Sequence, residues 1–343
     1  LVLLCGGTDG GNKEVIIANA KHLVAIDRPF TTIVAGNKSA NDDIKAIFDE
    51  AGKDVVITAN VMPQFNKLNI EPARDAIRQL FISRIIEAKG LNILQSMTSY
   101  KIIPTPLAVL HACELLSKGT KTQQGRGDLL AVDIGGATTD VYSMASGEPT
   151  VDNTMLKGLP EPWMKRTVEV DLGMRYSLTH VYEQIPGADN PENEYMQQVK
   201  AWVELCTARP DTLAAPGSEE EKLEEFLGRS AVSMAVERHC GRIADVYTPL
   251  GLMHTQEGKD LMNVPSVIGI GGVLRNSRRP EEILKGSLYD FMHPECTKPR
   301  KPKFYLDQKY IFASMGLLRS INPELAFELL DKETVEIGCN ATV

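Results

Sequence analysis

The sequence lacks the cysteine pairs, long apolar runs and excess positive charge that mark several common protein classes. Its six cysteines are scattered and form no C-x-x-C pair, which disfavours zinc and iron–sulfur sites and indicates reduced thiols in a cytoplasmic protein. No apolar run approaches the roughly 20 residues of a membrane span, and Leu1–Cys5 is too short for a signal peptide. The net charge of −8, from 37 Lys and Arg against 45 Asp and Glu, argues against nucleic-acid and membrane partners.

The composition and the spacing of turn residues instead favour a large α/β protein with two lobes. With 43% apolar residues among 343, the chain is long enough for two domains with full cores. A polar, glycine-bearing stretch at 118–127 marks the expected boundary. We therefore predict a first α/β lobe at 1–118 and a second lobe at 128–343, with a helical cap at about 190–247. The chain opens inside an apparent strand, which we interpret as N-terminal truncation of the first lobe.

Strands and helices alternate in the first lobe, which predicts a mainly parallel sheet. The first strand runs into Gly6–Gly11, with sequence GGTDGG, and a helix follows. Such a loop can hold phosphate at the helix N-terminus, and it can equally be a tight structural turn. Its glycines are not spaced as G-x-G-x-x-G, so it does not match a dinucleotide-binding fingerprint.

The second lobe is organised around the stretch Leu129–Val141, LLAVDIGGATTDV. Its apolar run predicts a buried strand, which has no structural use for the charge of Asp133 at its end. Two glycines then allow a sharp turn and the close approach of a ligand, two threonines add hydroxyl donors, and Asp140 opens the returning strand. This hairpin can cradle phosphate, with Asp133 holding Mg²⁺ through water. The alternative is an ordinary β-hairpin whose acids are solvated.

Two later segments complete the pattern of the second lobe. Asp171, in the motif D-L-G, is expected to cap a helix that runs to about Gln184, and residues 192–207 and 218–246 are expected to be helical. A strand at Pro265–Ile270 ends in a second glycine pair, Gly271 and Gly272. Such a turn lets a flat base or a ribose lie against the backbone.

These motifs resemble those of the actin, sugar kinase and heat-shock chaperone ATPase superfamily. VDIGGATTD is similar to its second phosphate motif, and the order of a Pro-Thr-x-x-A helix, phosphate hairpin, D-L-G segment, helical cap and G-I-G-G adenosine motif also fits. More closely, the chain resembles the MutL (GlmL) accessory proteins of adenosylcobalamin-dependent glutamate (methylaspartate) mutase, which are unrelated to the mismatch-repair proteins of that name. The resemblance runs along nearly the whole chain through LLCGGTDGGN, DIGGATTDVYS, VDLGMR and ASMGLL.

The resemblance implies an actin-like ATPase fold, built from ribonuclease H-like duplicated domains, that binds ATP or ADP with Mg²⁺. Asp133 would lie near the metal, bound through water, and Asp133 and Asp140 are the candidate catalytic acids. The expected phosphate contacts come from the hairpin: Gly135, Gly136, Ala137, Thr138 and Thr139. The expected adenosine contacts come from the second glycine turn: Gly269, Gly271, Gly272 and Val273.

The activity that the resemblance implies is an ATP-dependent reactivase, which exchanges damaged cobalamin on the mutase and is not itself the mutase. Its partners would be the mutase subunits. Chaperone ATPases have a Glu where this chain has Ile103, so hydrolysis is expected to be slow, and the superfamily's first phosphate hairpin, D-x-G-x-T, is absent from this chain. Two alternatives remain open: a small-molecule kinase of the same fold and a scaffold that does not hydrolyse ATP.

Overall fold

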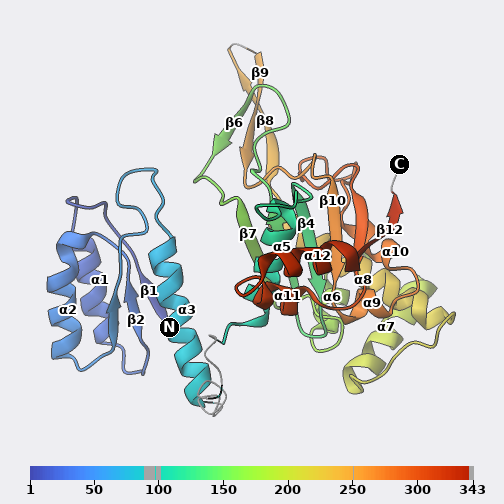
Figure 1. The fold of residues 1–343 in the computed structure, drawn as a ribbon, viewed down its shortest axis with the longest axis horizontal. Coiled ribbons are helices and arrows are strands. Elements are labelled where there is room, and N and C mark those ends of the chain that lie inside the picture. Colours follow the sequence, from blue (N-terminus) through green and yellow to red (C-terminus); the bar gives the residue numbers. More distant parts are fainter. Residues whose placement is uncertain (89–96, 98–101, 250, 340–343) are drawn as a thin grey trace. The chain divides into compact units, whose positions relative to one another are not determined.

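The computed structural model describes residues 1–88, 97, 102–249 and 251–339. The chain divides into two compact units, Leu1–Pro104 and Thr105–Val343, which are described separately (Figure 1). We expected the division within 118–127, but it falls earlier because the helix α5 (Thr105–Lys118) belongs to the second unit. The side chains of Val109 and Leu116 on this helix are buried against the sheet of that unit.

Unit 1 is a three-layered α/β unit, as its alternating pattern predicts. The strands described in this unit are parallel, in the order β1-β2-β3. Helices α1 and α2 pack together, and Ile16, Ile44 and Phe48 are fully buried in the core between these helices and the sheet. The elements of unit 1 are β1 (Val2–Leu4), α1 (Glu14–Val24), β2 (Thr32–Val34), η1 (Lys38–Ala40), α2 (Asn41–Glu50), β3 (Val55–Ile57) and α3 (Glu71–Ala88).

Unit 2 is built on a six-stranded mixed sheet in the order β12-β11-β10-β4-β5-β7. Strand β4 is antiparallel to β5 and parallel to β10, and β10 is parallel to β11. The predicted hairpin is thus confirmed as β4 and β5, in the centre of the sheet. The strands are β4 (Leu129–Ile134), β5 (Thr139–Met144), β7 (Met164–Glu169), β10 (Ser266–Ile270), β11 (Lys303–Asp307) and β12 (Thr334–Cys339).

Helices cover both faces of this sheet (Figure 1). One face packs against α5 together with α11 (Phe312–Leu318) and α12 (Pro323–Glu333). The other face packs against the remaining helices: α6 (Leu178–Glu183), α7 (Glu194–Ala208), α8 (Glu219–His239), α9 (Gly272–Asn276), α10 (Pro280–Leu284) and η2 (Lys285–Ser287). Leu129 and Ala131 of β4 face the first of these layers, and Leu130 and Val132 face the second, because side chains alternate along a strand.

Two expectations about local structure are wrong in unit 2. The helix expected from Asp171 begins only at Leu178, because the intervening residues form turns against the hairpin. The helix expected over 218–246 ends at His239, so the end of that range is not helical. Its last residues belong to β8 (Arg242–Thr248), which pairs with β9 (Gly251–Glu257) in a second sheet that also contains β6 (Thr154–Lys157).

No helix among the described residues is both long enough and apolar enough to cross a membrane.

Candidate functional site

The candidate site lies at the carboxyl edge of the large sheet, where β4 and β10 end side by side. The two strands are parallel neighbours, and Asp133 is in register with Ile270. The chain leaves β4 toward β5 on one side and leaves β10 toward β11 on the other. Such a point of divergence between adjacent parallel strands opens a crevice outside their carboxyl ends, where α/β proteins bind ligands. The two glycine turns predicted from the sequence therefore share one edge.

Gly271 brings the second turn into contact with the end of β4. Its φ of 102° lies in the left-handed region, which disfavours residues with a side chain. A Cβ at this position would lie 2.5 Å from the carbonyl oxygen of Ile134 and 2.8 Å from Oδ1 of Asp133. Only glycine fits this contact. Gly272 is different, because the nearest atom to its Cβ would be Asn276 Nδ2 at 3.8 Å, so its side is open.

Asp133 is a mostly buried carboxylate without a direct partner. Among the described residues it makes no ion pair and no side-chain hydrogen bond. Burial, reinforced by the negative charges of Asp140 and Asp307, raises its pKa from 3.8 to about 6. A perturbed carboxyl group at a ligand-binding edge is a functional-site candidate, because the free protein gains no stability from holding that charge there.

Asp140 faces Asp133 across the hairpin but has a different environment. It is nearly buried, and its Oδ1 accepts hydrogen bonds from Arg166, at 2.7 Å from Nη2 and 2.8 Å from Nε. Thr138 Oγ1 also lies 3.4 Å from its Oδ2. The guanidinium compensates this carboxylate, so Asp140 is anchored as part of the hairpin, whereas Asp133 has no such ion pair among the described residues.

The hairpin turn is held from behind by the D-L-G segment. Met174 N–H donates to the carbonyl of Gly135 at 3.0 Å, and Arg175 N–H donates to that of Gly136 at 2.8 Å. Gly173 packs so closely that a Cβ there would lie 2.2 Å from the carbonyl carbon of Ala137. The segment thus acts as a brace for the turn and not as the start of a helix.

This brace determines which hairpin groups face outward. The carbonyls of the turn are engaged, while the N–H groups of Gly136 and Ala137 donate to no acceptor within the part of the chain that the structure describes. The Thr139 hydroxyl is buried and already donates to the carbonyl of Leu172, so it is not presented to the crevice. Free N–H groups grouped at one turn form an anion-binding concavity.

Gly269 was predicted to contact the adenosine, but in the structure it packs against neighbouring side chains. It lies buried inside β10, where a Cβ would approach Leu274 and Leu284 to within 2.9 and 3.1 Å. Val273 is partly buried and packs against the same core. The open backbone of the turn is therefore at Gly271 and Gly272.

Asp307, at the end of β11, also belongs to this edge, although the sequence did not single it out. It is buried, and its carboxylate accepts hydrogen bonds from the N–H groups of Ile311 and Phe312 at 2.9 and 3.1 Å. Asp133 and Asp307 line one small cavity of about 30 Å³, together with Thr105, Tyr310 and others. A cavity of this size holds one or two water molecules. The sequence did contain a signal for Asp307, because this acid ends an apolar strand in the same way as Asp133 does.

The donor set fits a magnesium ion bound through water. No group of three or more His, Cys, Asp or Glu side chains is placed to hold a metal within the described ranges. Mg²⁺ does not require such a group, since it retains several waters and is bound by one or two carboxylates with substrate phosphates. The unpartnered Asp133 carboxylate is the group present for that role, because a nearby cation would offset its buried charge.

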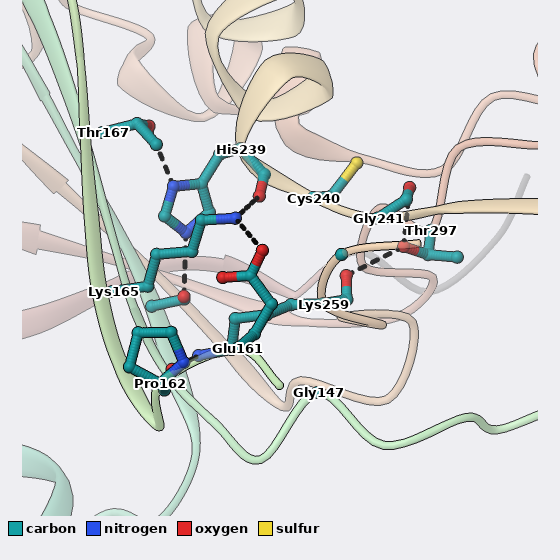
Figure 2. Close-up of polar contacts among 12 residues, drawn as sticks. Gly147, Glu161, Pro162, Lys165, Thr167, His239, Cys240, Gly241, Lys259 and Thr297 are labelled. Carbon is teal, nitrogen blue, oxygen red and sulfur yellow. Dashed lines mark hydrogen bonds and ion pairs between the residues drawn. The ribbon is translucent and has the colours of Figure 1, made fainter. Parts of the chain in front are cut away.

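A buried polar cluster joins β5 to α8, on the face of the sheet that α8 covers (Figure 2). His239, at the end of α8, is fully buried with its ring nitrogens 2.8 Å from Ser143 Oγ and 2.9 Å from Thr167 Oγ1. Burial and the positive charge of Lys165 lower the pKa of His239 well below 6.5, so the ring is neutral. Lys165 Nζ donates to the carbonyl of His239 at 3.1 Å. The cluster fixes α8 to β5 and β7.

The fold and the site define a two-unit α/β protein with a candidate ligand site at the strand divergence of its larger sheet. Residues 1–334 match the family model described as MutL protein. The chain is also 46% identical, over 340 residues, to Protein MutL of Clostridium tetanomorphum, an alignment that covers 98% of this chain and 73% of that protein. The chain therefore belongs to the MutL family, the glutamate mutase accessory proteins that its motifs resemble.

Proposed function

We propose that the edge of unit 2 binds ATP or ADP with Mg²⁺, and that the protein uses the nucleotide to exchange damaged cobalamin on glutamate mutase in the cytoplasm. The observation that carries the proposal is the close approach of Gly271 to Asp133 and Ile134 at the end of β4, where the strands diverge and the hairpin turn begins. The mixed sheet and its central hairpin lead us to assign unit 2 to the actin-like ATPase fold. We infer that the mutase subunits are its partners because the chain belongs to the MutL family.

Each part of the edge has a task in this proposal. The N–H groups of Gly136 and Ala137, with the Thr138 hydroxyl, hold phosphate oxygens. The Asp133 carboxylate accepts hydrogen bonds from water on the metal, and the metal supplies positive charge to the phosphates. The backbone at Gly271 and Gly272 receives the ribose and the base, because no side chain obstructs it.

Slow turnover is part of the proposal. The one carboxylate beside Asp133 on the hairpin, Asp140, is tied to Arg166 and is poorly placed to take a proton from water. Nucleotide binding, followed by infrequent hydrolysis, suits a protein that resets a partner and does not process a metabolite.

Calorimetric titration of the full-length protein with MgADP tests the binding. We expect Asp133→Asn to weaken MgADP binding on the order of tenfold or more. The matched control is Asp211→Asn, which makes the same change on the exposed surface of unit 2. Equal affinities for the two variants would remove Asp133 from the site.

Phosphate release, measured with and without mutase loaded with an inactive cobalamin, tests the activity. We expect slow release that the loaded mutase accelerates, together with recovery of mutase activity. Transfer of phosphate to a metabolite would identify a kinase instead. Failure of the full-length protein to bind MgADP would favour a scaffold.

A further inference from the structure

The GGTDGG loop of unit 1 is not used by the proposed nucleotide site, and it faces a cavity of its own. It follows β1, while Asn37 follows β2 and Asn60 follows β3. Because the three strands are parallel, these connections meet at the carboxyl edge of their sheet. Ligands of parallel α/β sheets bind at this edge.

Two buried asparagines lock the three connections together. Asn37 Oδ1 accepts from Gly10 N–H at 3.1 Å, and its Nδ2 donates to the carbonyl of Gly11 at 2.9 Å. Asn60 Nδ2 donates to the carbonyl of Gly7 at 3.0 Å and to Asp9 Oδ1 at 2.9 Å. The loop is therefore fixed in shape before any ligand arrives, which lowers the entropy cost of binding.

The shape so fixed leaves a cavity of about 340 Å³ between residues 5–8 and 60–62. This volume is within the range of small-molecule sites. It is more than ten times the volume of the cavity beside Asp133, which is about 30 Å³. The space is therefore large enough for an organic ligand and not only for water.

The two walls of this cavity differ in chemistry. On the loop side, the N–H groups of Gly7 and Thr8 have no acceptor within the described ranges, and the Thr8 hydroxyl lies beside them. Gly7 has a φ of 69°, and a Cβ there would lie 2.3 Å from the carbonyl oxygen of Asn12, so this wall requires glycine. The opposite wall includes the apolar side chains of Val61 and Met62.

The side chains that line the cavity carry no negative charge that would repel an anionic head group. Partial burial raises the pKa of the Cys5 thiol above 9.0, so it brings no negative charge. Asp9 is not part of the lining, and its Oδ1 is engaged by Asn60 and by the N–H of Lys38. The groups presented to the cavity are then mostly hydrogen-bond donors, which match the oxygens of a phosphate.

We propose that this cavity is a second ligand site, which binds the phosphate monoester of a small organic molecule. The phosphate contacts the N–H groups of Gly7 and Thr8 and the Thr8 hydroxyl, and the carbon skeleton lies against Val61 and Met62. The site belongs to unit 1 alone and goes beyond the proposed nucleotide function.

Calorimetric titration of the whole chain with ribose 5-phosphate, with ribose as the unphosphorylated comparison, tests the proposal. We expect ribose 5-phosphate to bind with a Kd on the order of 1 mM or tighter and ribose not to bind. Thr8→Val, which removes one donor at nearly constant volume, should weaken binding on the order of tenfold. Val61→Asp should abolish it, because the new carboxylate repels the phosphate.

The matched control is Ile26→Asp, which adds the same charge at an exposed position beyond the far end of α1. It should bind ribose 5-phosphate like the unchanged chain. Equal losses in Ile26→Asp and Val61→Asp would overturn the proposal, as would the absence of binding to the unchanged chain.

A further variant separates this site from the nucleotide site. If Thr138→Val and not Thr8→Val lowers the affinity for ribose 5-phosphate, the phosphate binds the hairpin of unit 2, and the second site is refuted. If Asp133→Asn weakens MgADP binding while ribose 5-phosphate still depends on Thr8, both sites stand. If Asp133→Asn leaves MgADP binding unchanged, only the nucleotide site is refuted. If Thr8→Val leaves ribose 5-phosphate binding unchanged, only the second site is refuted.

Discussion

Replacing Asp133 by asparagine should make the ligand-free protein more stable at neutral pH. The carboxyl group has a pKa of about 6 in the fold against 3.8 for the ordinary group. Each pKa unit corresponds to about 1.4 kcal/mol, so the shift sets an upper limit of roughly 3 kcal/mol. With some solvent and relaxation at the crevice, we expect a gain on the order of 2 kcal/mol for Asp133→Asn.

The sign of the pH dependence follows from which state binds the proton more tightly. Between pH 3.8 and about 6 the folded protein binds this proton and the unfolded chain releases it. The free energy of unfolding therefore falls as the pH rises through this range, and the full cost is present above pH 6. Asparagine cannot ionise, so the advantage of Asp133→Asn should vanish below about pH 4.

Urea unfolding of both proteins at about pH 4 and about pH 7.5 measures this difference directly. Asp211→Asn, at an exposed carboxylate, controls for the loss of one charge from the molecule. The reasoning is refuted if Asp133→Asn is less stable than the unchanged protein at about pH 7.5, or if its advantage persists unchanged at about pH 4. Saturating MgADP should narrow the difference by about 1.4 kcal/mol for a tenfold difference in affinity, because it stabilises the unchanged protein more than the variant.

Three other changes have defined outcomes. Gly271→Ala should lower the free energy of unfolding by at least about 2 kcal/mol in urea, because its Cβ would clash with Ile134 at 2.5 Å, whereas Gly272→Ala should be neutral or slightly stabilising. Gly173→Ala should displace the hairpin turn at 135–138 and, in the proposed function, weaken MgADP binding on the order of tenfold in a titration, with little change in far-UV circular dichroism. In urea titrations, the free energy of unfolding should fall less below pH 6.5 in His239→Gln than in the unchanged protein. In the unchanged protein the histidine binds a proton in the unfolded state but stays neutral when it is buried in the fold.

The parts of the fold that the sequence predicts are those determined by local pattern. The alternating strands and helices of unit 1 and the hairpin at β4 and β5 follow from short apolar runs separated by glycine turns. The pairing of the Asp133 turn with the later glycine turn was expected only through the resemblance. It depends on β4 and β10 being neighbours, and residues more than 100 positions apart carry no local signal of that adjacency.

The errors occur where distant groups decide the local structure. Asp171 does not cap a helix because Arg238, 67 residues away, binds both its carboxylate oxygens at 2.8 Å. This pairing lowers the pKa of Asp171 to about 2. Residues 242–248 leave the helical path because β9 supplies a strand partner. Gly241 marks that change, since a Cβ there would lie 2.8 Å from the carbonyl oxygen of Glu257.

The contrast between the two hairpin carboxylates is the strongest physical argument for a cation at this edge. Asp133 and Asp140 occupy equivalent places on paired strands, but among the described residues only Asp140 forms an ion pair with a guanidinium, that of Arg166. Stability alone gives no reason to retain a buried acid at Asp133, because an amide of the same shape would lack its charge penalty. In the proposed function, a hydrated cation bound with its phosphates would offset this penalty, so the unfavourable charge of the free protein would favour binding. The glycine at 271 fits the same reasoning, because any side chain there would fill the space beside the carboxylate.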